Sequence, residues 1–285
     1  MLQIFLQNFR EIPPSLLSVF SIAMGLTLGS FLNVVVARLP HKQSIIRPGS
    51  HCPHCQKAVR WYDNIPVLSY LLLRGKCRAC KAEISVRYPI IELLTALLFV
   101  AVQARFGFGP WLFFRDWPFV MILVAVTFID LEHRLIPDVL SLGGLVLGLL
   151  TCWMVPSVGW ITAFSGAALG FGVFYAFAWL YERFTGRSGL GGGDIKFLAM
   201  LGAFLGPEGV FHTILISSVL GSLIGLGWGA YLKYKGPKGP QEPGDGQNVP
   251  TLMKLSVPYG PFLVLGGLYY YLLGDLIWFR FTTPI

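Results

Sequence analysis

Hydrophobic residues dominate this chain in long runs, and most polar residues lie between the runs. Eight apolar runs are candidates to cross a bilayer, which takes roughly 20 residues of helix. They cover residues 16–37, 88–104, 117–129, 139–158, 160–181, 195–205, 210–232 and 257–279. The third and sixth runs are too short by themselves, so each must extend into the polar residues beside it. The pattern predicts an all-α polytopic membrane protein with about eight transmembrane helices.

One polar segment interrupts this pattern, between the first and second runs. Residues 38–87 contain ten Lys and Arg residues against the two acidic residues Asp63 and Glu83. Positively charged loops remain on the cytoplasmic side of a membrane. We therefore expect a first transmembrane helix within residues 1–37, a small cytoplasmic domain over residues 38–87, and a seven-span membrane domain over residues 88–285.

The composition and the charge distribution agree with this topology. Hydrophobic residues make up 54% of the chain and charged residues 13%, which excludes an ordinary soluble domain. Eight spans put both termini outside with only four basic residues, while the other eighteen of the 22 fall inside. The net charge of +8 is thus mainly a topology signal, with attraction to the lipid bilayer as a secondary effect. No recognition motif supports nucleic-acid binding.

Two Cys-x-x-Cys pairs in the polar segment predict a metal site. Twenty-one residues separate the pairs, close to the usual spacing of a zinc site with four thiolate ligands. The cysteines are Cys52, Cys55, Cys77 and Cys80. Four thiolates leave no position for a catalytic water, so the zinc ion would be structural. Disulfides are the alternative, which a cytoplasmic location disfavours. His51 and His54 could also act as ligands, although four cysteines suffice.

An aspartate lies where the third run must extend. To cross the bilayer, this helix must continue past Ile129 towards Ile136, which places Asp130 about 9 Å inside its end. A carboxylate at membrane depth is costly and is a candidate for function. Pro137 then ends or kinks the helix. We expect Asp138 to be the N-cap of the next helix, with a catalytic role as the alternative.

A second aspartate opens the sixth run, in the sequence Gly191-Gly192-Gly193-Asp194-Ile195-Lys196. The glycines allow another backbone to approach closely, as a site for an extended peptide requires; a loop that simply caps a span is the alternative. The order of the spans puts Asp130 and Asp194 on the same side of the membrane. Lys196 could favour the charged form of one aspartate, or it could anchor the helix at the headgroups.

Other polar and small residues in the apolar runs have structural alternatives. Glu92 faces protein or water, and we expect it to support the site or to make a structural hydrogen bond. Asn33 is expected to bond to a neighbouring helix. Gly25 and Gly29 have the spacing that allows close helix packing, and so has a ridge of three glycines in the seventh run. The ridge comprises Gly221, Gly225 and Gly229.

Two carboxylates that face each other in a low-dielectric site are suited to peptide hydrolysis. They do not both ionise easily, so the pair titrates as a unit. The ionised member can take a proton from water while the protonated member polarises the scissile carbonyl. Neither a Ser/His/Asp set nor a His-Glu-x-x-His motif competes with this pair.

Together these motifs resemble those of the bacterial type IV prepilin peptidases, aspartic proteases of the Gly-x-Gly-Asp class. The resemblance extends over nearly the whole chain, and its motifs occur in the family's order. They are residues 29–40, the two cysteine pairs, Arg87-Tyr88-Pro89 with Glu92, residues 130–138 and residues 191–196.

The resemblance implies that Asp130 and Asp194 are the catalytic pair and that Gly191 and Gly193 shape the site, with Lys196 beside it. It implies a multi-pass protein of the bacterial inner membrane that removes the basic leader of prepilins or type II secretion pseudopilins at the cytoplasmic face, after a glycine. It also implies N-methylation of the new N-terminal residue with S-adenosylmethionine. The sequence has no Gly-x-Gly-x-x-Gly motif that would place the methyl donor, and it leaves the oligomeric state open.

Two other functions fit parts of the pattern. Intramembrane acids can relay protons in a transporter, but such a protein would need internal repeats, which the sequence does not show. A zinc-dependent membrane metalloprotease would lose its activity at once when the metal is removed.

Overall fold

The computed structural model describes residues 13–155, 158–186, 191–235 and 258–277, and within these ranges its regular structure is helical apart from two isolated β-bridges. The helices that follow the apolar runs are α2 (Pro14–Arg38), α4 (Arg87–Phe106), α5 (Trp117–His133), α6 (Asp138–Thr151), α7 (Trp160–Thr185), α8 (Gly192–Lys235) and α9 (Gly260–Ile277). Short elements are η1 (Trp61–Asn64), α3 (Leu68–Leu72), η2 (Leu112–Asp116) and η3 (Cys152–Met154). The predicted all-α class is confirmed.

Five of the described helical stretches are long and apolar enough to cross a membrane. They are Pro14–Arg38, Arg87–Phe106, Leu112–His133, Trp160–Thr185 and Gly192–Gly227. The helices α6 and α9 are apolar but shorter. The chain is therefore a multi-pass membrane protein by the length and composition of its helices, whereas the number of eight crossings remains a prediction.

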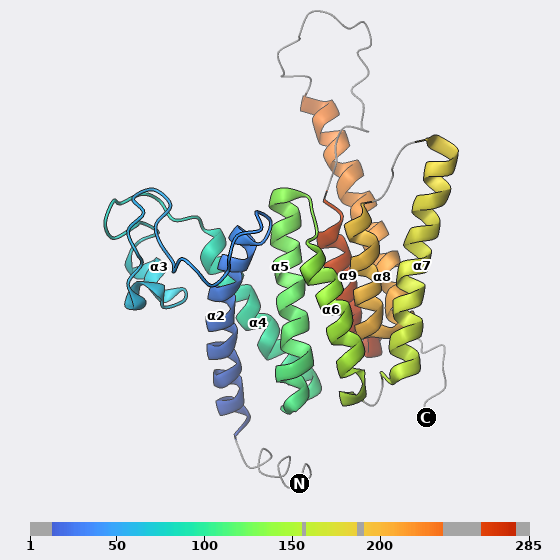
Figure 1. The fold of residues 1–285 in the computed structure, drawn as a ribbon, viewed down its shortest axis with the longest axis horizontal. Coiled ribbons are helices and arrows are strands. Elements are labelled where there is room, and N and C mark those ends of the chain that lie inside the picture. Colours follow the sequence, from blue (N-terminus) through green and yellow to red (C-terminus); the bar gives the residue numbers. More distant parts are fainter. Residues whose placement is uncertain (1–12, 156–157, 187–190, 236–257, 278–285) are drawn as a thin grey trace, which may run out of the picture.

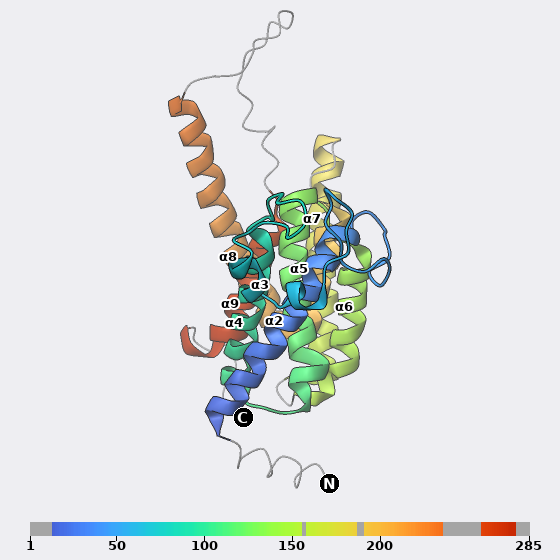
Figure 2. The ribbon, with the colours of Figure 1, turned by 90° about the vertical axis from the view of Figure 1, so that its left-hand side faces the viewer.

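The long helices lie side by side in a bundle that has two groups (Figure 1). In the first group, α2 packs along α4, and α5 contacts both of them. In the second group, α8 packs against α6, α7 and α9. The polar segment between α2 and α4, which contains η1 and α3, lies beside α2 at one end of the bundle (Figures 1 and 2).

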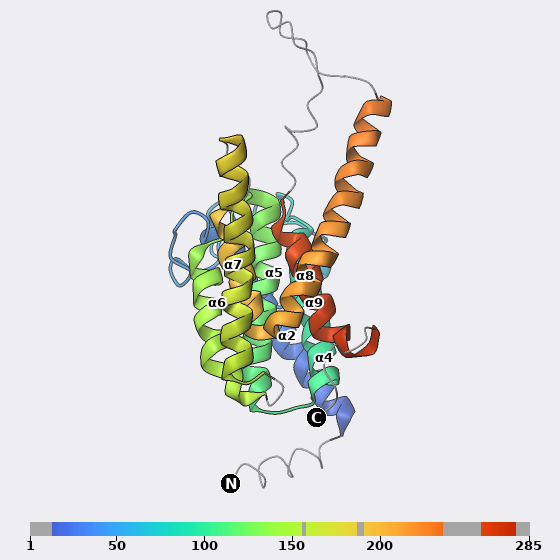
Figure 3. The same ribbon diagram turned by 90° about the vertical axis from the view of Figure 1, so that its right-hand side faces the viewer.

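The α8 helix is broken at Gly206, where the chain reverses its direction. Gly206 has φ 73° and ψ −178°, and Pro207 follows it. Just before the break, the Phe204 carbonyl accepts a hydrogen bond from Arg115 at the opposite end of α5 from Asp130. The second half of α8 then runs back along the bundle (Figures 1 and 3). The sixth and seventh apolar runs thus form the two halves of α8.

A buried ion pair occurs near this turn. The π-helical turn η2 places Arg115 and Asp116 at only 2% and 1% exposure, with Arg115 Nη1 3.5 Å from Asp116 Oδ1. Buried charges are stable only when they are paired and hydrogen-bonded, and Arg115 also donates to the Phe204 carbonyl. Arg115 is one of the four basic residues that the predicted topology places outside the membrane. In the structure, it also ties η2, just before α5, to the turn in α8.

Glycines allow the closest helix contacts in the bundle. A Cβ atom at Gly25 would lie 2.4 Å from the Ala96 Cα, so the predicted close packing of the first helix is confirmed. The predicted ridge in the seventh run makes no close helix contact at Gly221 or Gly225, and the surroundings of Gly229 lie outside the described residues. A Cβ at Gly221 would have no neighbour nearer than 3.8 Å, and one at Gly225 would meet nothing within 4 Å. A Cβ at Gly221 would make only ordinary van der Waals contact, whereas Gly225 faces open space.

The contact between α7 and α8 gives a testable prediction. We expect Gly166→Ala to lower the melting temperature in detergent by several degrees, because a Cβ at Gly166 would lie 2.2 Å from the Gly202 carbonyl oxygen. Overpacking of this kind costs about 1–3 kcal/mol. Gly172→Ala on the same helix is the matched control, since its Cβ would meet nothing within 4 Å. Equal melting temperatures for the two variants would contradict the prediction.

Candidate active site and metal centre

Asp130 lies near the end of α5 and is almost buried. Its side chain is 5% exposed, and its Oδ2 accepts a hydrogen bond of 2.9 Å from the backbone N–H of Gly260. Gly260 is the first residue of α9. A Cβ at this position would lie 2.7 Å from Oδ2, so the close approach of the α9 backbone requires glycine. The start of the last helix therefore forms one wall of the site.

Asp194 lies in the first turn of α8 and is partly buried. Its backbone N–H donates a hydrogen bond of 3.1 Å to the Gly191 carbonyl. The carboxylates of Asp130 and Asp194 are close enough for their charges to interact. Within the described part of the chain, neither carboxylate forms an ion pair with a basic residue. The structure thus brings the two predicted aspartates together at one end of the bundle, from α5 and α8.

The glycines before Asp194 leave room for its carboxylate and for the neighbouring loop. A Cβ at Gly191 would lie 3.0 Å from Asp194 Oδ2. A Cβ at Gly193 would lie 3.1 Å from the Cβ of Ile136, in the connection between α5 and α6. Side chains at these two positions would therefore crowd the carboxylate or push the connection away from α8.

Asp138 and Lys196 have a different role from the one expected. Pro137, not Asp138, is the N-cap of α6, and no side chain caps this helix. The prediction of Asp138 as the N-cap was wrong, because the Asp138 carboxylate instead accepts a hydrogen bond of 2.7 Å from Lys196 Nζ. This ion pair joins α6 to the first turn of α8. Lys196 therefore does not pair with Asp130 or Asp194.

Glu92 and Asn33 connect α4 to other parts of the chain. Glu92 is 6% exposed, and its Oε2 accepts a hydrogen bond of 2.7 Å from the backbone N–H of Val67 in the polar segment. Asn33 donates to the Tyr88 carbonyl at 3.2 Å, which confirms the expected bond between helices. Glu92 therefore contacts the polar segment, and among the described residues it makes no hydrogen bond to Asp130 or Asp194.

The four cysteines of the polar segment form a cluster that can hold a metal ion. Their Sγ atoms all lie within 4.8 Å of one another, and the Sγ atoms of Cys52 and Cys80 are 3.7 Å apart. A tetrahedral zinc ion with Zn–S bonds of about 2.3 Å separates its sulfur ligands by about 3.8 Å. All four cysteines are free thiols, so the disulfide alternative has no support from the geometry. His51 instead contacts the Gly49 carbonyl through Nδ1.

The four cysteines lie in two turns of similar conformation. In the first, Cys52 N–H donates to the Lys57 carbonyl; in the second, Cys77 N–H donates to the Ala82 carbonyl. Each turn is closed by an isolated β-bridge, His51 with Ala58 and Lys76 with Glu83. Gln56 and Lys81, which follow the second cysteine of each turn, both have positive φ. The cluster is therefore assembled from two copies of one local conformation.

The thiols of the cluster are unequal in acidity. Backbone N–H groups of Cys80 and Ala79 hydrogen-bond to the Cys77 sulfur and lower the pKa of this thiol to about 6. At Cys80, the Ala82 N–H favours the thiolate, but burial and contacts with the other three cysteines raise the pKa to about 11. Four thiolates so close together repel one another, so a cation is needed to hold all of them ionised.

Gly260 was not among the predicted site residues, because no site residue was assigned to the last apolar run. A backbone N–H donor leaves little trace in a sequence. The available signal was the position of Gly260 between Pro258 and Pro261 at the start of the last run, where a glycine allows close backbone approach.

Both halves of the chain match models of known protein families. Residues 23–106 match the model of the bacterial peptidase A24 N-terminal domain, and residues 117–226 match the model of the type IV leader peptidase family. The chain is 35% identical to a protein of Pseudomonas putida, over 96% of each chain, and 37% identical to one of Aeromonas hydrophila, over 89% of each. Both are named prepilin leader peptidase/N-methyltransferase.

A relative of the same name from Myxococcus xanthus is 42% identical over 74% of this chain, which spans 63% of that relative's length. No solved structure matches the chain. A membrane protein with these matches is a membrane-bound peptidase. The chain belongs to the type IV leader peptidase family. The comparisons give no support to the alternative of a proton-coupled transporter.

Proposed function

We propose that this chain removes the leader peptide from type IV prepilins or type II secretion pseudopilins and then methylates the new N-terminal residue. The observation that carries the peptidase proposal is the pairing of Asp130 with Asp194. Two helices from distant parts of the chain bring these carboxylates together without a basic partner among the described residues. A structural ion-pair network would include such a partner.

In the proposed reaction, the two aspartates share one proton. The ionised carboxylate takes a proton from a water molecule, and the water oxygen attacks the scissile carbonyl carbon. The protonated carboxyl donates its proton to the carbonyl oxygen. The C–N bond then breaks, and the leaving amine takes up a proton from the pair. The N–H of Gly260 holds Asp130 in place through Oδ2 and leaves Oδ1 for this work.

The glycines and Lys196 shape the site around this pair. Gly191 and Gly193 leave space beside Asp194 for an extended substrate backbone. Lys196 acts indirectly, since its ion pair with Asp138 fixes the start of α8 against α6. Both side chains of this pair are partly exposed, so the pair contributes little stability by itself.

The proposed orientation follows from charge. The basic polar segment, residues 38–87, would lie at the cytoplasmic face of the bacterial inner membrane. Asp130 and Asp194 would lie at the same face, since the end of α5 contacts this segment through an edge-on ring contact of His41 with His133. A substrate cut after a glycine, just before its hydrophobic helix, would then place its basic leader in the cytoplasm. The segment itself would form a separate domain between a first helix and a seven-span peptidase domain.

We propose that zinc fills the four-cysteine cluster and has a structural role. The ligands Cys52, Cys55, Cys77 and Cys80 would hold residues 38–87 together. The relatives are named N-methyltransferases, and we propose that the methyl group for the second reaction comes from S-adenosylmethionine.

A single assay tests both activities. Purified protein in detergent is incubated with S-adenosylmethionine and a peptide that carries a basic leader, a Gly-Phe junction and an apolar helix, and the products are measured by mass spectrometry. We expect cleavage after the glycine, followed by addition of about 14 Da, one CH₂ group, to the fragment that begins with Phe. Folded protein that cleaves none of several such leaders would overturn the peptidase proposal.

A further inference from the structure

Residues 61–72 of the polar segment, which contain η1 and α3, expose several large apolar side chains. Trp61 is 82% exposed, and Leu68, Leu71 and Leu72 are 50%, 64% and 73% exposed. Apolar side chains gathered on one surface mark a contact with another protein or with a membrane. The depth of these residues along the helix bundle decides between the two.

A hydrogen bond to α4 gives the first measure of depth. The 20 residues of α4 span about 30 Å, which is the thickness of the hydrocarbon core of a bilayer. Val67, between η1 and α3, donates its backbone N–H to Glu92 Oε2 at 2.7 Å. Glu92 follows Arg87, the first residue of α4, by five residues or about 7.5 Å of helix. The chain at Val67 therefore lies level with the outer part of the core.

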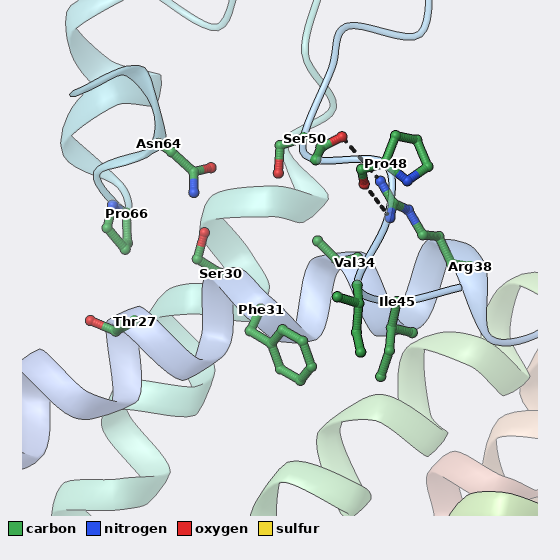
Figure 4. A pocket seen from close by; sticks show the side chains of 12 residues that line it. Thr27, Ser30, Phe31, Val34, Arg38, Ile45, Pro48, Ser50, Asn64 and Pro66 are labelled. Atoms are coloured by element: carbon green, nitrogen blue, oxygen red, sulfur yellow. Dashed lines mark hydrogen bonds between the residues drawn. The ribbon is translucent and has the colours of Figure 1, made fainter. Parts of the chain in front are cut away.

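The contact with α2 gives the second measure. Figure 4 shows Asn64 and Pro66 across a pocket of about 290 Å³ from Thr27 and Ser30 of α2. Ser30 precedes Arg38, the last residue of α2, by eight residues or about 12 Å. The 25 residues of α2 span about 37 Å, so at most about 7 Å of this helix extends beyond the core at this end. Figure 1 agrees, since α3 lies beside α2 and below the level at which α5 ends.

The polar groups of this region are satisfied within the polar segment. Asp63 is the only charged residue of η1, α3 and their connection, and both of its oxygens accept hydrogen bonds of 2.6–3.0 Å from Arg78. Ser69 is buried, donates to the Tyr62 carbonyl at 2.9 Å and accepts the Ile65 N–H at 3.1 Å. Contact with lipid requires polar groups to find partners within the protein in this way.

Basic residues flank the apolar surface. Arg60 precedes η1, and Arg74, Lys76 and Lys81 follow α3; all four are exposed. Basic side chains next to a membrane surface are attracted to anionic lipid headgroups. Apolar side chains between basic flanks are typical of a segment that lies about 5–10 Å deep in the membrane interface, which is the depth that the contacts with α4 and α2 give.

We propose that η1 and α3, residues 61–72, lie in the interface of the bilayer that the helix bundle crosses. Trp61 and the exposed leucines contact the acyl chains, and the flanking basic residues contact anionic headgroups. Residues 38–87 are then docked on the membrane beside α2 and α4 and are not surrounded by water on all sides. The inference goes beyond the proposed function and depends on neither the peptidase nor the methyltransferase proposal.

The docked helix is tied to the metal cluster. The Gly75 N–H donates to the Tyr70 carbonyl of α3 at 2.9 Å, and the Ile84 N–H donates to the Gly75 carbonyl at 2.7 Å. These two hydrogen bonds flank the turn that holds Cys77 and Cys80. Contact of α3 with lipid therefore fixes this turn near the membrane surface.

Photolabelling by lipid tests the proposal on the unmodified protein. The full, zinc-loaded chain is reconstituted in vesicles of phosphatidylcholine and phosphatidylglycerol with a phospholipid that carries a diazirine in one acyl chain. After irradiation, the adducts are mapped by mass spectrometry. We expect adducts on residues 68–72, and on Leu93 and Leu97, which are exposed on α4 and serve as the positive control. Val86, apolar and 58% exposed but just before the start of α4, should carry much less label.

Label on α4 in the same sample without label on residues 61–72 would overturn the proposal and would leave a protein partner as the occupant of this surface. The result does not depend on leader cleavage, so it is separate from the test of the peptidase proposal.

Substitution of the leucines gives an independent measurement. In the same vesicles, replacement of both residues, Leu71→Gln with Leu72→Gln, should accelerate amide exchange over residues 61–73 by about tenfold or more, because the contact with acyl chains is lost. Val86→Gln is the matched control and should exchange as the unmodified protein does. Unchanged exchange in the double variant would overturn the proposal, since glutamine in place of a leucine that faces water removes no contact.

The lipid composition tests the role of the basic flanks. Arg74→Gln should accelerate exchange over residues 61–73 by about fivefold in vesicles with phosphatidylglycerol, and much less in vesicles of phosphatidylcholine alone. An equal effect in both kinds of vesicle would overturn the assignment of anionic headgroups to this residue.

Discussion

Replacement of Asp130 or Asp194 by asparagine is expected to reduce leader cleavage at least about a thousandfold, since each variant removes one half of the acid–base pair. Asparagine keeps the size of the side chain, and at position 130 its carbonyl can still accept the N–H of Gly260. The protein should therefore insert and fold. Because the two residues act as one unit, the double variant should be no slower than either single variant. Initial rates of cleavage, followed by mass spectrometry, provide the measurement.

Asp138→Asn is the matched control for these variants. Asp138 lies at the same end of the bundle but pairs with Lys196, and both side chains are partly exposed. The variant should keep most of the cleavage activity, because partly exposed ion pairs contribute about 1 kcal/mol or less. If Asp138 proved essential and Asp130 dispensable, the assignment of the catalytic pair would be wrong.

Replacement of a metal ligand should have the second largest effect of the substitutions considered. It should change the folding of residues 38–87 and affect leader cleavage only indirectly. Structural zinc contributes about 10–16 kcal/mol in small zinc-binding peptides, and residues 38–87 have few buried apolar side chains of their own. We expect Cys77→Ser to bind no zinc and to accelerate amide exchange across residues 52–83 by about a thousandfold or more. Metal analysis of the purified protein should find one zinc ion per chain.

Cys152→Ser is the control, because Cys152 is buried in η3, far along the chain from the metal cluster, and its thiol donates a hydrogen bond to the Leu149 carbonyl. It should keep both the zinc ion and the slow exchange. Brief treatment with a chelator separates the structural role from a catalytic one. Immediate loss of cleavage before residues 38–87 lose their protection would instead indicate a metalloprotease.

The sequence predicted the membrane helices and the meeting of the two aspartates. Helix positions follow from apolar runs, which depend on local composition. The proximity of Asp130 and Asp194 follows from two features of the sequence. The order of the spans places both aspartates on the same side of the membrane, and the two short apolar runs can cross the bilayer only if the helices include these neighbouring polar residues. The break in α8 also had a local signal, since Gly206-Pro207 separates two apolar runs.

Contacts between residues that lie far apart in the chain could not be predicted from the sequence pattern. The prediction of Asp138 as a helix cap used only its neighbours in sequence, whereas its carboxylate pairs with a lysine 58 residues away. Glu92 was recognised as unusual, but its partner, the N–H of Val67, is a backbone group without a sequence signature. The pocket beside α2 forms only when the polar segment folds back along the helix, so no single stretch of sequence contains it.

The hydrogen bond from Gly260 to Asp130 has a consequence for biosynthesis. The acceptor lies on α5 and the donor comes 130 residues later, at the start of α9. A nascent chain that has released α5 and the first half of α8 from the ribosome already carries both aspartates, yet Asp130 has not received its backbone donor. The site is complete only when the last helix is made and inserted. Because the helices are made in this order, the hydrogen bond to Asp130 forms only after all the other membrane helices have been synthesised.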